Sequence, residues 1–215
     1  MVLRLTVFAL SIGMAAATLA AGSPVMAEAI QPPGDQQPLE PMHPPSDLPK
    51  PQHGDRTRNL DFLFEALKVA PDDASAKAVE DRIWALWLAS GSDTANLLMS
   101  RVKTAVEAQD VDLAIKLLDY IIELKPDYTE AWNRRATLYY MKKDYAHALA
   151  DIEQVLAREP RHFGAISGLG MILQEYGDDK HALEAFRRAL AIHPHLQRIP
   201  ELVKSLTEKV EGRDI

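Results

Sequence analysis

The chain has 215 residues, of which 47% are hydrophobic and 26% are charged, a composition typical of one soluble domain with short appendages. Its formal net charge of −7 offers no basic stripe of the kind that binds nucleic acid. It has no cysteine, which excludes disulfides, thiolate metal sites, cysteine nucleophiles and a lipidated cysteine.

Residues 1–27 have the features of an export signal. Arg4 gives a positive start, residues 5–21 form an apolar run rich in alanine, and a V-M-A sequence ends at Ala27. A membrane-spanning helix needs about 20 apolar residues, so we expect cleavage, with a retained anchor as the alternative. Cleavage after Ala27 would leave the mature protein in the periplasm of a Gram-negative bacterium, without stable membrane insertion.

Residues 28–55 form a proline-rich segment with almost no large apolar residues. Such a segment cannot bury enough surface to fold, so we predict an extended, disordered linker. It is either a plain tether or a spacer that a proline-binding module recognises. Its prolines are Pro32, Pro33, Pro38, Pro41, Pro44, Pro45, Pro49 and Pro51.

Residues 56–94 begin the folded region, with apolar residues at helical spacing on either side of Pro71. Trp84 and Trp87 lie 34 residues before two apolar residues of the next segment, although Glu80 stands where a small residue is expected. We therefore predict a degenerate N-terminal helical repeat. The tryptophan pair is either part of its core or a ligand platform.

Three units of 34 residues follow, at 95–128, 129–162 and 163–196. Each predicts a helix, a turn and a second helix: small residues allow close helix approach, an aspartate caps the second helix, and a proline ends it. Equivalent residues are Leu98, Trp132 and Ile166; Val102, Ala136 and Gly170; Ala105, Tyr139 and Leu173; Asp110, Asp144 and Asp178; Ala114, Ala148 and Ala182; and Pro126, Pro160 and Pro194.

This pattern resembles the tetratricopeptide repeat (TPR) family, whose repeat has 34 residues, an early aromatic, small crossing residues and a closing proline. The resemblance implies an all-α solenoid, a right-handed superhelix of antiparallel helix pairs that serves as a binding scaffold. Residues 197–215 then supply a C-terminal capping helix, with Leu202, Leu206 and Val210 along one face. We expect a small exported TPR protein.

The resemblance also implies that the first helix of each repeat lines a concave groove. The transferred positions are Asn96, Met99, Lys103 and Val106, then Glu130, Asn133, Arg134, Thr137 and Tyr140, then Ser167, Met171 and Gln174. The partner-binding residues that we predict are Met99, Lys103, Asn133, Arg134, Thr137, Tyr140, Met171 and Gln174. Lys103 and Arg134 could receive a carboxylate of a peptide; alternatively, Arg134 pairs with a neighbouring acid and the groove is merely solvated.

Arg101 and Arg135 stand where family members usually carry leucine. They either form ion pairs with acids such as Asp119, Glu123 or Asp151, or extend the charge of the groove.

Family members that bind chaperones clamp a C-terminal carboxylate with a set of lysines and asparagines. That set is incomplete here, since Met99 and Gly168 replace polar positions.

No catalytic, metal or cofactor motif is evident. His147 and His181 share a position in adjacent repeats, and helices packed about 10 Å apart hold such residues too far apart for one ion. We therefore predict a non-catalytic scaffold or adaptor in the cell envelope that binds a protein or peptide, without a cofactor, metal or nucleic acid. The alternative is a regulatory subunit or an enzyme whose activity lacks a recognisable motif.

Overall fold

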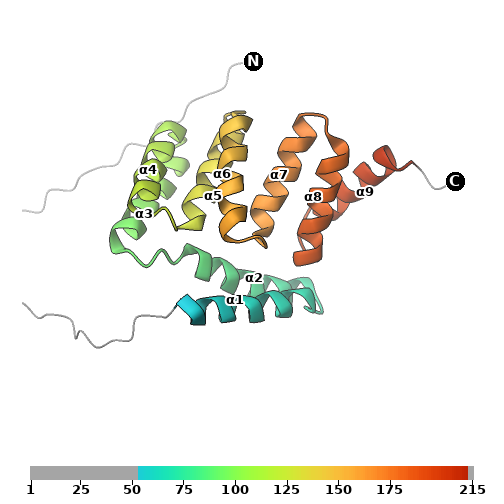
Figure 1. The fold of residues 1–215 in the computed structure, drawn as a ribbon, viewed down its shortest axis with the longest axis horizontal. Coiled ribbons are helices and arrows are strands. Elements are labelled where there is room, and N and C mark those ends of the chain that lie inside the picture. Colours follow the sequence, from blue (N-terminus) through green and yellow to red (C-terminus); the bar gives the residue numbers. More distant parts are fainter. Residues whose placement is uncertain (1–52, 213–215) are drawn as a thin grey trace, which may run out of the picture. The chain divides into compact units, whose positions relative to one another are not determined.

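The structure is a computed structural model that describes residues 53–212, and their side chains from Thr57 onward. This part of the chain is all α-helical (Figure 1). The helices are α1 (His53–Lys68), α2 (Asp73–Leu88), α3 (Asp93–Glu107), α4 (Val111–Leu124), α5 (Thr129–Met141), α6 (Tyr145–Arg158), α7 (Phe163–Glu175), α8 (Asp179–Ile192) and α9 (Ile199–Val210).

The predicted signal at 1–27 and most of the predicted linker lie outside the described residues. Helix α1 begins at His53, so the boundary predicted at residue 55 falls inside a helix. Within residues 53–212, no helix is both long and apolar enough to cross a membrane.

The predicted repeats form three antiparallel pairs, α3 with α4, α5 with α6, and α7 with α8, and α9 packs on α8 (Figure 1). The aspartates cap the second helices as predicted. Asp110 accepts the backbone N–H of Leu113 at 3.0 Å, and Asp144 and Asp178 accept the N–H groups three residues ahead at 3.3 Å each. Each cap uses a carboxylate to satisfy a backbone group that the helix itself leaves free.

The small residues lie where two helices of a repeat cross. Ala148 and Ala182 are fully buried, and Ala136 is 4% exposed. A Cβ added to Gly170 would lie 2.6 Å from the Phe186 ring. A residue with a side chain at position 170 would therefore not fit against α8 at this distance. The apolar core therefore runs between the helix pairs, as a repeat array requires.

Helices α1 and α2 form the expected helical hairpin, but they do not stack on α3 as a further repeat would. They contact α8 and α5 instead, and Figure 1 shows them crossing beneath the repeats. Residues at one repeat position, 34 apart, meet the hairpin: Tyr128 donates to the Leu88 carbonyl at 2.9 Å, His162 stacks on Trp87, and Leu196 joins the apolar cluster of the hairpin. The segment predicted as a degenerate N-terminal repeat is thus a helix pair that does not continue the stack of the three repeats.

The physical reason lies in Glu80, which replaces the small crossing residue of a repeat. Its carboxylate accepts the indole N–H of Trp84 at 2.9 Å and lies 3.7 Å from Nε2 of His193 in the turn after α8. Glu80 thus directs its carboxylate to the turn after α8, where a small residue could make no such contact. Trp87 is 4% exposed and Trp84 is half-buried, so the tryptophan pair belongs to the core.

Candidate functional site

A cavity of about 170 Å³ opens between α5 and α7. Ala136, Ile152 and Ile172 supply its buried apolar residues, and Gly168 leaves space because it has no side chain. The polar and larger residues around it are Asn133, Thr137, Tyr140, Ser167 and Met171. The hydroxyls of Thr137 and Ser167 donate to carbonyls of their own helices, those of Asn133 and Phe163.

The structure brings together Asn133, Thr137, Tyr140 and Met171 of the predicted partner-binding residues. Gln174 lies one turn beyond Met171 on α7 and is exposed. Met99 packs against the apolar core of the first repeat, and Lys103 is 74% exposed with Glu107 at 3.7 Å. The predicted site therefore separates into a compact part on α5 and α7 and two residues on α3.

Arg134 pairs with an acid on its own helix. Its Nε donates to Glu130 at 3.1 Å, and the Asn133 amide donates to the other carboxylate oxygen at 3.1 Å. The Glu130 side chain is 3% exposed, whereas that of Arg134 is 37% exposed. The terminal nitrogens of Arg134 have no partner within residues 53–212. Because Glu130 neutralises Arg134, this end of the groove carries no net positive charge.

His162 connects the same carboxylate to the hairpin. Its Nδ1 accepts the backbone N–H of Ala165 at 3.1 Å, so its proton is on Nε2, which lies 3.5 Å from Glu130. The fully buried ring stacks on Trp87 with centroids 4.1 Å apart. A chain of contacts therefore runs from α2 through His162 to the carboxylate beside Asn133. His162 was not predicted as part of this site; its only signal in the sequence is its repeat position, which it shares with Tyr128 and Leu196.

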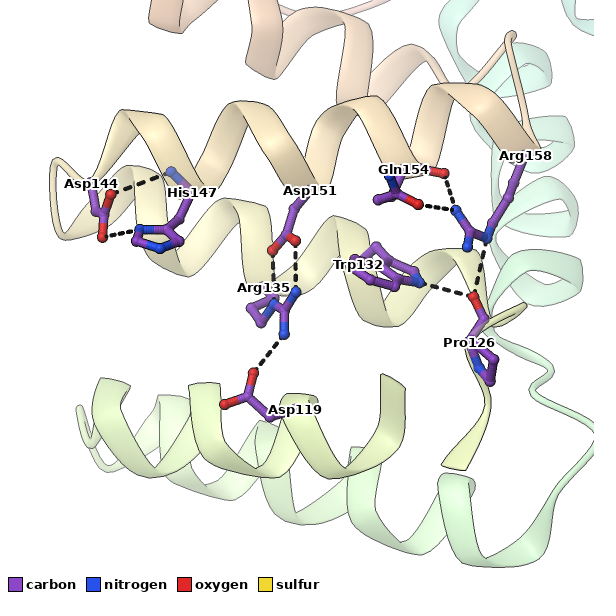
Figure 2. Close-up of polar contacts among 9 residues, drawn as sticks. All are labelled: Asp119, Pro126, Trp132, Arg135, Asp144, His147, Asp151, Gln154 and Arg158. Carbon is purple, nitrogen blue, oxygen red and sulfur yellow. Dashed lines mark hydrogen bonds and ion pairs between the residues drawn. The ribbon is translucent and has the colours of Figure 1, made fainter. Parts of the chain in front are cut away.

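On the other side of α5, Arg135 bridges the first two repeats (Figure 2). It donates to both carboxylate oxygens of Asp151 at 2.7 and 2.8 Å and to Asp119 at 2.6 Å. Both acids raise the pKa of Arg135, with Asp151 the larger cause. The ion pairs predicted for Arg135 are thus confirmed, whereas Arg101 is exposed and forms no ion pair with any described residue.

Two histidines of the repeats contact the caps of their own helices. His147 and His181 each contact the aspartate that caps their own helix, at 2.7 Å and 2.8 Å. Within residues 53–212, no three histidine, aspartate or glutamate side chains are placed to hold a metal ion. His195 lies in the turn after α8 and joins it to α2, through contacts of 2.6 Å to Asp73 and 3.0 Å to the Ala70 carbonyl.

The fold and the groove define this part of the chain as an α-solenoid of paired helices. A family model described as "Tetratricopeptide repeat" matches residues 129–162. A TPR repeat-containing protein of Rhizobium etli is 44% identical over 155 residues, which are 72% of this chain and 76% of that protein. The chain therefore belongs to the tetratricopeptide repeat family, whose members generally serve as protein-binding scaffolds.

Two solved structures share the fold at low sequence identity. The first TPR of Spaghetti (RPAP3), bound to HSP90 peptide SRMEEVD, has a TM-score of 0.53 and 18% identity, and covers 56% of this chain and 95% of that chain. The Sgt2 TPR domain from Aspergillus fumigatus has a TM-score of 0.50 and 21% identity, and covers 56% of this chain and 81% of that chain.

Proposed function

We propose that this protein is a non-catalytic scaffold that binds a peptide segment of another protein in the groove between α5 and α7. The observation that carries this proposal is the cavity of about 170 Å³ beside Asn133. A cavity of about 150 Å³ holds a benzene molecule, so one side chain the size of leucine or phenylalanine fits. A groove formed on rigid helices lets a flexible peptide bind at the cost of ordering only itself.

The chemistry of the groove favours an apolar anchor over a clamp for a carboxylate. Apolar residues line most of the cavity, Glu130 already balances Arg134, and Lys103 lies on a different helix beside Glu107. In the first TPR of Spaghetti the bound peptide ends in the sequence E-E-V-D, which is acidic apart from its valine. For this chain we propose an apolar side chain in the cavity. An acidic group of the same peptide would bind the terminal nitrogens of Arg134.

The experiment selects peptides from a displayed random library on the full chain, then measures their affinity for variants. Gly168→Leu fills the cavity, and its α-helical backbone accepts a side chain: a Cβ there lies 3.7 Å from Ile152. Excluding one apolar anchor should weaken binding about 10- to 100-fold.

Gly168→Ala is the matched control, because one methyl group leaves most of the cavity open. Arg134→Gln should weaken only those peptides that carry an acidic residue. Equal affinity of the selected peptides for the wild type and Gly168→Leu, with both chains folded, would refute the groove assignment.

We also propose that the scaffold works in the cell envelope, outside the cytoplasm. Support comes from the sequence, which has a positive start, the apolar run at 5–21 and the V-M-A sequence ending at Ala27. The full chain with a C-terminal tag, expressed in a Gram-negative bacterium, should appear in the periplasmic fraction with Glu28 as its first residue. An intact N-terminus in the cytoplasmic fraction would contradict this proposal.

A further inference from the structure

Helix α4 has a second apolar face in addition to the one that packs in the core. Leu113, Tyr120 and Leu124 are 45%, 61% and 50% exposed, and Leu117 between them is half-buried. The intervals of four, three and four residues place all four side chains in one stripe along the helix. This stripe, which we call the α4 seam, is separate from the groove between α5 and α7.

The second repeat has a corresponding face on α6, and its contacts can be compared with those of the α4 seam. The α6 residues one repeat later are His147, Asp151, Gln154 and Arg158, and they adjoin side chains of α5 (Figure 2). On this face, Asp151 forms an ion pair with Arg135, which also forms an ion pair with Asp119 of α4. Arg158 of the same face donates to the Pro126 carbonyl at 3.1 Å. In the third repeat, Arg188 donates to the Pro160 carbonyl.

On α6, Asp151 is buried by its contact with Arg135, whereas His147 and Arg158 stay exposed, and the exposed side chains of this face are polar. The α4 seam exposes apolar side chains instead, and no earlier repeat lies beside it, because α3 and α4 are the first pair and the hairpin lies across the turns. Arg101, at the position of Arg135, likewise finds no acid among residues 53–212. The array thus has an apolar end at α4, whereas at its other end α9 presents Glu201, Lys204 and Glu208 to solvent.

We propose that a second copy of this chain covers the α4 seam, so that two α4 helices pack antiparallel in a two-fold symmetric dimer. The seam has the alternating spacing of three and four residues that packs helix against helix. Only one end of the array is apolar, so the contact joins like ends and closes at two copies.

The charges beside the seam select the antiparallel direction. Lys116 and Glu123 are both exposed, lie seven residues apart on one edge of the seam, and have no ion pair among the described residues. Two antiparallel helices bring the same edge of each together. Lys116 of one copy then faces Glu123 of the second copy, and symmetry repeats the pair. A parallel arrangement would place this edge against Ile121, which the core of its own chain already buries.

Sedimentation equilibrium of the full chain, 23.9 kDa, over a range of concentrations tests the proposal. The wild type should reach twice that mass. Tyr120→Asp, present twice per dimer, should raise the dissociation constant about 100-fold. Tyr176→Asp is the matched control, because Tyr176, directly after α7, is 60% exposed and lies far from the seam in sequence. It should leave the dissociation constant unchanged.

Charge reversal tests the direction of packing. Lys116→Glu and Glu123→Lys alone should each raise the dissociation constant about tenfold, because each creates two like-charged contacts. The double variant should restore association to near the wild-type value. A wild-type chain that stays monomeric would overturn the proposal, as would a dimer that tolerates Tyr120→Asp. A dimer that loses affinity with Tyr120→Asp but ignores the charge reversals would overturn the antiparallel arrangement.

Discussion

Gly168 and Gly170 lie two residues apart on α7, yet their surroundings differ. A Cβ at Gly170 would meet Phe186 at 2.6 Å, whereas one at Gly168 would meet only Ile152 at an ordinary 3.7 Å. The first glycine permits the helix crossing, and the second leaves the groove open.

We predict that Gly170→Ala lowers the free energy of unfolding by about 1–3 kcal/mol, because the added methyl group overpacks the crossing. Gly168→Ala should raise it by about 0.5–1 kcal/mol, because alanine loses less entropy in a helix. Urea unfolding of the full chain measures both. Similar losses for the two variants would mean that α7 and α8 are not packed as described.

Arg135 is surrounded by carboxylates, at a repeat position where most TPR repeats have leucine. The third repeat shows the apolar solution, with Leu169 and Ala185 at the positions of Arg135 and Asp151. The side chain of Asp151 is 5% exposed. Its buried negative charge is therefore stable only because Arg135 pairs with it.

Arg135→Leu alone should therefore cost about 3–5 kcal/mol in unfolding free energy, because Asp151 would be buried without a partner. Arg135→Leu combined with Asp151→Ala, which copies the third repeat, should recover most of that loss. The check is a double-mutant cycle by urea unfolding. Additive losses in the double variant would show that the two side chains are not coupled.

At the level of elements, the 34-residue spacing predicted three helix pairs and their aspartate caps, and the apolar face of Leu202, Leu206 and Val210 predicted the final helix. These features depend on contacts within one repeat or between neighbours, so their pattern recurs along the sequence. The placement of the hairpin could not be predicted in this way. It depends on the contacts of Tyr128, His162 and Leu196 with α1 and α2. Nothing in the sequence next to His162 indicates that this side chain makes such a contact.

The candidate site shows the same division. Asn133, Thr137, Tyr140 and Met171 were predicted from their repeat positions, since each position fixes a face of a helix. The pairing of Arg134 with a buried glutamate was one of two open alternatives. The environment of that glutamate depends on His162, which ends the same repeat and caps α7, the first helix of the next one.

His195 gives the attachment of the hairpin a pH dependence. Both its ring nitrogens face acceptors, Asp73 and the Ala70 carbonyl, so the contact requires a protonated ring. The hydrogen bond to Asp73, followed by that to Ala70, raises the pKa of His195 above 6.5. The stabilisation is therefore fully present below the ordinary pKa and is lost as pH rises through the raised one.

We predict that His195→Ala lowers the unfolding free energy more at about pH 6 than at about pH 9. Comparing the variant with the wild type at each pH removes contributions from other groups. His193 is the control, because burial lowers its pKa, so its contribution is lost as pH falls instead. An equal effect of His195→Ala at both pH values would contradict the protonated contact.

At the scale of the whole molecule, the groove and the α4 seam lie on different helices and share no residue. We predict that they function independently. Gly168→Leu should abolish peptide binding without altering sedimentation, and Tyr120→Asp should do the reverse. Peptide titration and sedimentation of both variants measure this. If either variant changes both properties, peptide binding and association would use one surface.

The most direct test of the central claim locates a bound peptide on the chain. A photoreactive amino acid replaces Thr137, which is exposed beside the cavity on α5, or Glu184, which is exposed on α8, in the full chain. A library-selected peptide should cross-link from position 137 and not from position 184, and Gly168→Leu should eliminate the cross-link. Equal yields from the two positions, or a yield at 137 that Gly168→Leu leaves intact, would contradict binding in the groove.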